Sequence, residues 1–181
     1  MILFINACVR KQSRTLKLAR KLLDKLNGEI KEVILEDIDF PVLNEEFILR
    51  RDELMNAGRY DDPMFDLGRD FAEADMIVIA APYYDLSFPA MLKQYFEQIN
   101  VLGLTFCYSE SGVPQGLCRA GSLYYVTTSG GYILSDELGF GYVKALANTF
   151  YGIEDVHQIK AEGLDIIGAD VDAILSNVSI D

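Results

Sequence analysis

Short runs of apolar residues alternate along the chain with longer stretches in which apolar residues recur every three or four positions. The first kind of pattern predicts buried strands, and the second predicts helices that bury one face. The runs predict five strands, at 2–5, 29–35, 75–81, 122–128 and 155–163. The periodic stretches predict helices at 16–26, 64–74, from Pro89 onward, 135–151 and 168–178.

The central predicted strands, such as "MIVIAA", are apolar without alternation. Strands covered on both faces have this composition, whereas half-exposed strands alternate. The pattern predicts an α/β fold: a flavodoxin-like, doubly wound, five-stranded parallel sheet in the order 2-1-3-4-5, with helices on both faces. We expect residues 1–181 to form a single domain. Segments 36–63 and 103–120 exceed ordinary connections, which predicts covering or functional elements there.

The net charge of −12 argues against nucleic acid or an anionic membrane as the main partner. Residues 1–27 nevertheless carry +6, so the rest of the chain carries −18. These cations can coat a solvated helix face and can also create a positive field around an anion near residues 10–15, and both can hold. No membrane span or secretion signal is recognisable, and we expect a cytoplasmic protein.

Metal chemistry is not expected from this composition. The three cysteines (Cys8, Cys107 and Cys118) are odd in number and lack the spacing of metal ligands, which indicates reduced thiols. The single histidine, His157, lies in a predicted strand. A zinc site would therefore need an all-carboxylate shell, and we predict no metal site.

Unusual residues are concentrated after the first, third and fourth strands, whose loops lie side by side in such a sheet. The first loop, "NACVRKQSRT" (6–15), enters a helix, so its last residues present unpaired N–H groups and the positive end of a helix dipole. Arg10 adds a positive charge, and Ser13 and Thr15 add hydroxyl donors. Together they suit a phosphate monoester, although an ordinary Ser-capped helix contains the same residues. The loop lacks GxGxxG and P-loop spacing.

The second loop, "PYYDLSFP" (82–89), combines two prolines with two adjacent tyrosines. Residues 82–86 form a rigid, partly aromatic wall that suits a flat ring system, and unpaired backbone groups there can bond ring heteroatoms. Alternatively, Asp85 or Ser87 caps the helix at Pro89, and the tyrosines only cover the core.

The third loop, "TTSGGYI" (127–133), contains two glycines that permit positive φ angles and a close approach of the backbone to a ligand. Their N–H groups can face a position where negative charge develops, although a Gly-Gly turn is a common structural feature. The three loops together favour a phosphorylated planar cofactor.

Four stretches in order, "APYYDLSFPAMLKQYFEQI", "GLTFCYSESGVPQGL", "TTSGGYI" and "AEGLD", resemble the flavodoxin-like NAD(P)H:quinone reductase and FMN-dependent NADH-azoreductase family. The resemblance runs from the first strand to the last and is strongest between Ala81 and Tyr132. It implies that FMN is bound non-covalently, and that the chain forms a homodimer with active sites at the subunit interface.

Carried over by position, the resemblance implies three groups of FMN-binding residues. They are Arg10, Ser13, Arg14 and Thr15 at the phosphate, Pro82, Tyr83, Tyr84, Asp85 and Leu86 along the isoalloxazine edge, and Thr128, Ser129, Gly130 and Gly131 beyond the pyrimidine end. Tyr108 and Phe150 match positions on the substrate side of the flavin.

The sequence departs from the family at two places. Asp85 stands where the family usually has Asn, and the phosphate loop reads "ACVRKQSRT" instead of the commoner Ser-Pro-Arg opening. An ionised Asp85 that faces the flavin would oppose the negative charge of the reduced ring. Asp85 alternatively points away from the flavin, is protonated, or lowers its potential.

The resemblance implies an FMN-dependent NAD(P)H oxidoreductase that passes hydride through the flavin to quinones, azo compounds or similar acceptors. The flavin carries the chemistry, so no side chain is expected to be catalytic, and Gly130 and Gly131 would stabilise charge on the reduced ring. A flavodoxin-type electron-transfer protein fits the acidic charge. A non-enzymatic flavin-binding module fits if Asp85 prevents reduction.

Two apolar stripes on the helix from Pro89 favour the homodimer. Leu92, Phe96 and Ile99 form one stripe, and a second stripe beside it comprises Met91, Tyr95 and Leu102. A helix that packs only on its own sheet needs a narrower apolar face. Cover by loop 103–120 is the alternative.

Overall fold

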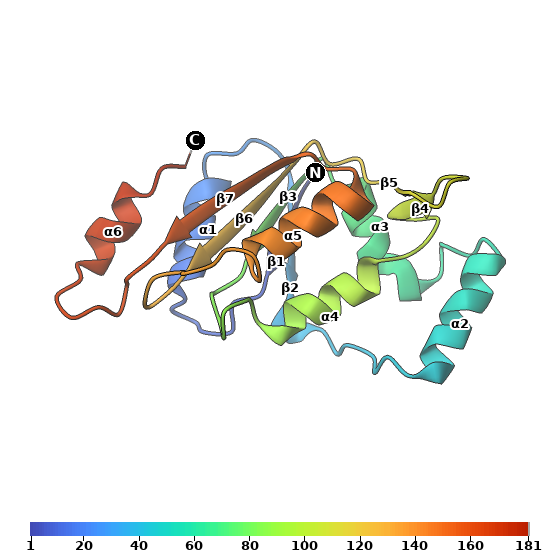
Figure 1. Ribbon diagram of the computed structural model, residues 1–181, viewed down its shortest axis with the longest axis horizontal. Coiled ribbons are helices and arrows are strands. Elements are labelled where there is room, and N and C mark those ends of the chain that lie inside the picture. The colour runs from blue at the N-terminus through green and yellow to red at the C-terminus, as the bar shows by residue number, and fades with distance from the viewer. Residues whose placement is uncertain (181) are drawn as a thin grey trace.

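The computed structural model describes residues 1–180, and its centre is a five-stranded parallel sheet (Figure 1). The strands are ordered β2-β1-β3-β6-β7, and every neighbouring pair is parallel. Their bounds are Ile30–Ile34 (β2), Ile2–Asn6 (β1), Met76–Ala80 (β3), Ser122–Thr128 (β6) and Asp155–Ala161 (β7). The predicted order 2-1-3-4-5 and the flavodoxin-like fold class are confirmed.

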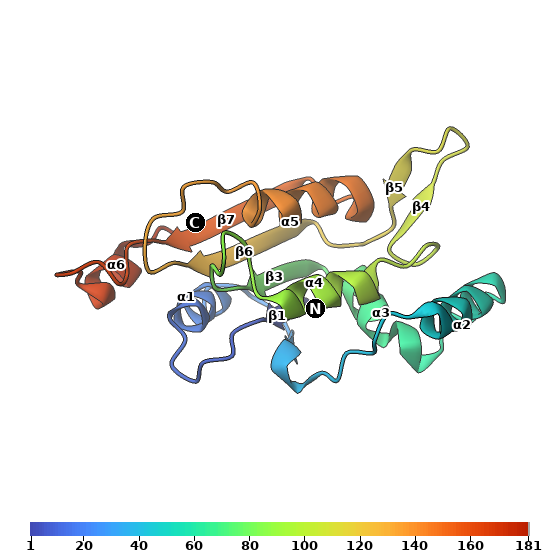
Figure 2. The same ribbon diagram turned by 60° about the horizontal axis from the view of Figure 1, so that its bottom comes forward.

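Helices cover both faces of the sheet (Figure 2). On one face lie α1 (Arg14–Leu23) and α6 (Val171–Asn177). On the other lie α3 (Asp66–Glu73), α4 (Ala90–Ile99) and α5 (Phe140–Leu146). The predicted helix 135–151 begins only at Phe140 and ends in a π-helical turn, Ala147–Tyr151. Gly152 caps this turn with a φ of 74°.

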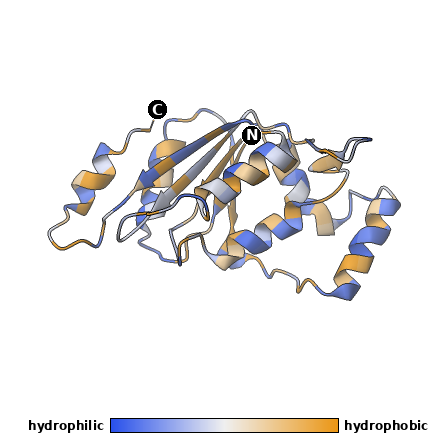
Figure 3. Cartoon of the chain, viewed as in Figure 1, coloured by the Kyte–Doolittle hydropathy of each residue, from blue (hydrophilic) through white to orange (hydrophobic). Residues whose placement is uncertain are grey.

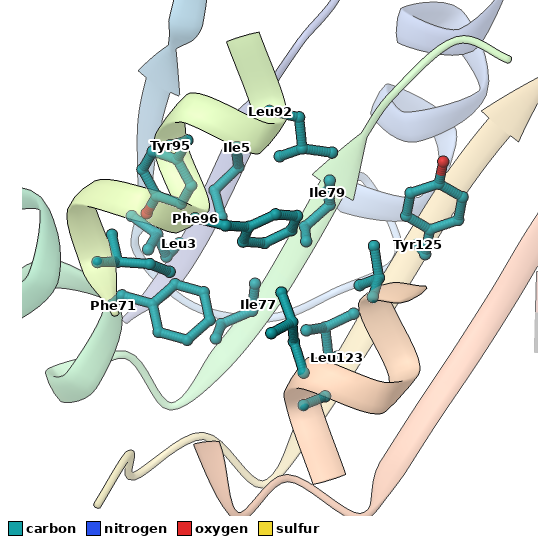
Figure 4. Close-up of a cluster of buried hydrophobic side chains, with 14 of the residues drawn as sticks. Leu3, Ile5, Phe71, Ile77, Ile79, Leu92, Tyr95, Phe96, Leu123 and Tyr125 are labelled. Atoms are coloured by element: carbon teal, nitrogen blue, oxygen red, sulfur yellow. The ribbon is translucent and has the colours of Figure 1, made fainter. Parts of the chain in front are cut away.

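The central strands bury both of their faces, which explains why their sequences do not alternate. In β1, Leu3 and Ile5 belong to the core under α3, α4 and α5, whereas Ile2 and Phe4 belong to the core under α1 and α6. None of the four side chains is more than 3% exposed. Figure 4 shows the first core, where Phe96 of α4 lies against the sheet. The edge strand β7 is largely hydrophilic (Figure 3).

The two long connections contain elements that the apolar pattern does not predict. The first holds α2 (Glu45–Asn56), with short 3₁₀ turns at Leu35–Asp37 and Pro63–Phe65. The second holds an antiparallel hairpin of β4 (Phe106–Tyr108) and β5 (Pro114–Gly116). Figure 2 shows this hairpin extending from the end of the molecule opposite the carboxyl ends of the parallel strands.

The second apolar stripe of α4 is covered largely within the chain. Tyr95 is fully buried, and its ring lies 6.4 Å from that of Phe71 on α3. Met91 is half-buried, and only Leu102 is exposed. Because α3 covers the central residue of this stripe, α4 gives little support to a homodimer, which stays a prediction.

Candidate functional site

A pocket of about 180 Å³ lies at the carboxyl edge of the sheet, where the loops after β1, β3, β6 and β7 meet. The predicted meeting of the first three loops is therefore observed. The pocket is lined by Val9, Arg10, Gln12, Ser13, Arg14, Thr15, Pro82, Tyr83, Tyr84, Thr128, Ser129, Gly130 and Asp165. Asp85, Leu86 and Gly131, which were expected at the cofactor, do not line it.

The first loop delivers the start of α1 to this pocket. Ser13 is the N-cap of α1, and its Oγ accepts a hydrogen bond of 3.2 Å from the backbone N–H of Leu16. An N-cap side chain pairs with only one of the backbone N–H groups of the first turn, so the other N–H groups of that turn remain available to bind an anion. The first turn of α1 contains no acidic residue. The capped helix and the anion site are thus compatible readings of the same residues.

Two of the cations of residues 1–27 lie at the pocket, and two others bind neighbouring elements. Arg10 and Arg14 line the pocket. Arg20 instead pairs with Glu32 at 2.5 Å, and Lys21 donates to the carbonyl of Leu175 on α6. The positive charge near the pocket therefore comes from two guanidinium groups, while cations farther along α1 bind neighbouring elements.

A hydroxyl pair joins the first loop to the end of β6 at the pocket. Thr15 Oγ1 and Thr128 Oγ1 lie 2.6 Å apart, and the two residues are 1% and 7% exposed. One hydroxyl donates to the other, so the accepting hydroxyl retains its own proton to donate elsewhere. Since both residues line the pocket, this proton is available to a ligand oxygen.

The second loop is a tight turn between Tyr84 and Ser87. The backbones of these two residues exchange hydrogen bonds of 3.0 and 2.7 Å, and Asp85 and Leu86 between them have φ of 48° and 69°. Positive φ at both central positions is the geometry of a type I′ turn, which favours Asn, Asp and Gly. Asp85 suits the first position, whereas Leu86 costs roughly 1–2 kcal/mol in the left-handed region.

The alternative reading of Asp85 or Ser87 as a cap of α4 is wrong. The N-cap is Pro89, and no side chain caps the helix. Ser87 Oγ instead donates to the carbonyl of Leu138 at 2.5 Å. The aromatic wall at the pocket consists of Pro82, Tyr83 and Tyr84, while Asp85 and Leu86 form an exposed tip.

The glycines of the third loop do not adopt the positive φ angles that the sequence permits, and their role at the flavin stays a prediction. Neither Gly130 nor Gly131 has a positive φ. A Cβ at Gly130 would lie 2.1 Å from Asp165 Oδ2, so glycine leaves room for the carboxylate in its observed position. Gly131 is exposed, and its carbonyl accepts hydrogen bonds from Ser129 Oγ (2.6 Å) and Gly163 N (2.9 Å). The loop is thus built for close contact with the segment after β7.

Two acidic residues after β7 hold the site, although the sequence pattern assigned a role to neither. Glu162 Oε1 accepts the backbone N–H of Ile133 at 2.7 Å and so tethers the third loop. Arg14 Nη1 donates to Asp165 Oδ1 at 2.8 Å and to the carbonyl of Leu164 at 3.0 Å. The Arg14 hydrogen bond and the nearby Arg10 charge lower the pKa of Asp165, which keeps it ionised. Their position after a parallel strand is the signal that could have found them.

Tyr108 and Phe150, expected on the substrate side, do not line the pocket. Both contact Phe106 of the hairpin, with ring centroids 5.6 and 4.7 Å from its own. The hairpin lies beyond the far end of the sheet (Figures 1 and 2), so one chain does not bring these residues to the pocket.

The lining residues form a binding site without an acid–base or nucleophilic pair. They include no histidine and no cysteine. Cys8 lies just before them, but its thiol is buried, and burial raises its pKa to about 11. Within residues 1–180 no three His, Cys, Asp or Glu side chains are grouped to hold a metal ion, and no helix is long and apolar enough to cross a membrane.

Comparison with known proteins places the chain in a family. A family model described as flavodoxin-like fold matches residues 1–178. The FMN-dependent NADH:quinone oxidoreductase 2 of Clostridium acetobutylicum is 37% identical over 188 aligned positions, which cover 97% of this chain and 92% of that protein. The chain belongs to this flavodoxin-like oxidoreductase family. The FMN-dependent NADH:quinone oxidoreductase of Lachnoclostridium phytofermentans is 34% identical, with 95% of this chain and 90% of that protein covered.

Solved structures with the flavodoxin-like oxidoreductase fold agree with this assignment. An azoreductase from Bacillus anthracis str. Sterne matches with a TM-score of 0.83 at 22% identity, covering 97% of this chain and 92% of that chain, which supports the fold alone. An FMN-dependent NADH-azoreductase from Bacillus anthracis str. Ames Ancestor, solved in complex with FMN, matches with a TM-score of 0.79 at 26% identity and the same coverage.

Proposed function

We propose that the chain is an FMN-dependent NAD(P)H oxidoreductase that reduces quinones, azo compounds or similar small acceptors. The observation that carries the proposal is one pocket in which two arginines, four buried hydroxyl-bearing residues and the start of α1 meet an aromatic wall. Relatives whose names specify FMN and NADH support the same cofactor and co-substrate here.

The donors in the pocket fit the phosphate end of FMN. Arg10 and Arg14 supply positive charge, Ser13, Thr15 and Thr128 carry hydroxyls, and α1 supplies unpaired N–H groups. A phosphate monoester carries two charges and three terminal oxygens, which such a donor set can satisfy. The loop after β1 has no glycine-rich turn for a dinucleotide pyrophosphate.

The ring end of FMN would lie at the mouth of the pocket. A cavity of about 180 Å³ is smaller than the ~300–1,000 Å³ of sites that enclose a drug-sized ligand. The isoalloxazine would therefore extend along Pro82, Tyr83 and Tyr84. The face of the ring that points away from these residues would not be covered by this chain. A second copy of the chain would supply that cover, with Tyr108 from its hairpin and Phe150 from the turn after its α5 on the substrate side.

Each part of the chain then has a defined task. Bound FMN supplies the ability to accept and return hydride. Arg10, Arg14 and the hydroxyls anchor the phosphate, the wall orients the ring, and the N–H of Gly130 can stabilise negative charge near it. In this proposal the flavin carries the chemistry, and no side chain is assigned a catalytic role.

The other functions weighed from the sequence make different demands on the protein. An electron-transfer protein would bind FMN but exchange electrons with a protein partner. A flavin-binding module would bind FMN without catalysing the oxidation of NAD(P)H. The relatives' names, which specify NADH and quinone, favour the enzyme. Cytoplasmic location, a single-domain chain and a homodimer stay predictions.

Flavin binding tests the proposal directly. We expect the purified protein to bind FMN with quenching of its fluorescence, and to bind riboflavin at least about tenfold more weakly, because several charge-assisted hydrogen bonds are lost with the phosphate. Arg14→Gln should weaken FMN binding and leave riboflavin binding unchanged. Absence of FMN binding, or equal affinity for both flavins, would refute the proposed site.

A further inference from the structure

Asp165 places a carboxylate in a pocket whose other charged lining groups are cationic. Its Oδ1 accepts the 2.8 Å hydrogen bond from Arg14 Nη1, and Arg14 and Arg10 are the charged side chains that act on it. The same Arg14 nitrogen also donates to the carbonyl of Leu164. An Nη nitrogen carries only two protons, so both are committed. A phosphate that needs this face of Arg14 must displace Asp165 or share the guanidinium with it.

The position of Asp165 does not depend on its charge. Its backbone N–H donates to the carbonyl of Gly130 at 2.9 Å, which anchors the residue to the third loop. The absence of a Cβ at Gly130 leaves the space that the carboxylate occupies. The side chain itself is 67% exposed and can rotate toward solvent without loss of packing. The backbone of Asp165 is therefore held at the pocket, while its carboxylate can move away when a ligand binds.

The lining side chains sum to +1 with Asp165 ionised and would sum to +2 without it, because Arg10 and Arg14 are the only other charged lining residues. We propose that Asp165 is a specificity-determining residue: an internal carboxylate that competes with the ligand's phosphate for Arg14 and limits the negative charge that the pocket accepts. It favours a single phosphate monoester over ligands with a pyrophosphate. The inference rests on the proposed FMN site.

Asp165→Asn isolates this charge, because Asn keeps the size of the side chain and an oxygen that can accept from Arg14. Dissociation constants for FMN and riboflavin, and the inhibition of FMN binding by inorganic pyrophosphate, would be measured for both proteins. We expect FMN to bind roughly three- to tenfold more tightly to Asp165→Asn, since one repulsive charge near a dianion is removed in a partly solvated pocket. Riboflavin affinity should not change, and pyrophosphate should compete more strongly.

Two further variants serve as controls. Asp172→Asn removes the same charge from an exposed position in the first turn of α6, outside the pocket, and should change FMN affinity less than about twofold. Asp165→Glu keeps the charge and should bind FMN like the wild type.

Unchanged or weaker FMN binding by Asp165→Asn would overturn the inference, as would an equal shift for FMN and riboflavin. If the wild type binds FMN, either result leaves the proposed function intact. If it binds no FMN, the proposed function fails, and the inference fails with it.

Discussion

At the scale of single residues, the hydroxyls of Thr15 and Thr128 couple the first loop (residues 6–15) to the end of β6. They lie 2.6 Å apart although 113 positions separate them in the chain. The two residues are only 1% and 7% exposed, so water replaces a lost hydroxyl partner poorly. Leaving a buried polar group unsatisfied costs about 1–3 kcal/mol, more than the net contribution of the bond itself.

A double-mutant cycle tests this coupling. Thr128→Val should lower the free energy of unfolding by about 1–2 kcal/mol, because Thr15 Oγ1 is left without a partner. In Thr15→Val/Thr128→Val the loss should be smaller than the sum of the two single losses. Urea unfolding measures all four proteins, and the exposed Thr149→Val is the control, which should change stability by less than about 0.5 kcal/mol. Strictly additive losses would show that the two hydroxyls act independently.

Residue identities at the site were more predictable than residue roles. The strand–helix loop itself singled out Arg10, Ser13 and Thr15, and the family resemblance added Arg14; all four line the pocket. Leu86 in the left-handed region could not be predicted, because its sequence neighbours do not demand it. The purpose of Gly130 depends on Asp165, 35 positions later, and no local pattern contains that contact.

At the scale of elements, the β4–β5 hairpin is held against the end of α5 by a backbone contact. A Cβ added at Gly116 would lie 2.1 Å from both the N of Gly152 and the carbonyl carbon of Tyr151. Backbone atoms cannot move aside as a side chain can. Only glycine at position 116 therefore allows β5 to approach the turn that ends the helix.

Gly116→Ala should separate the hairpin from α5 and lower the free energy of unfolding by about 1–3 kcal/mol, the range typical of overpacking. Gly121→Ala is the matched control, because nothing lies within 4 Å of its Cβ position and its φ is not positive. The control should be neutral or slightly stabilising. Thermal and urea unfolding would compare the two variants, and equal stability would mean that the hairpin does not depend on this contact.

The elements that bury a clear apolar face were predictable, and the others were not. The parallel strands and α1, α3 and α4 follow the apolar pattern closely. By contrast, α2 buries only Leu54, so its sequence carries no helical periodicity to recognise. Each strand of the hairpin spans three residues, too few for a pattern. Before α5 begins at Phe140, the preceding loop contacts the second loop, where Ser87 Oγ donates to the carbonyl of Leu138.

At the scale of the whole molecule, topology predicted where the site lies. Parallel strands end at one edge of a sheet, so the loops after β1, β3 and β6 had to meet there. The same rule applies to the loop after β7, which supplies Asp165. Tyr108 and Phe150 instead contact Phe106 of the β4–β5 hairpin, which lies at the opposite end of the molecule (Figure 2), so their proposed role requires a second copy.

The central claim is that FMN held by this chain exchanges hydride with NADH or NADPH and a small acceptor. The most direct test is an anaerobic titration of the FMN-loaded protein with each nucleotide, followed by absorbance. We expect the band of oxidised flavin to disappear at stoichiometric NADH or NADPH and to return when a quinone is added. Bound FMN that keeps its band with both nucleotides would contradict the account.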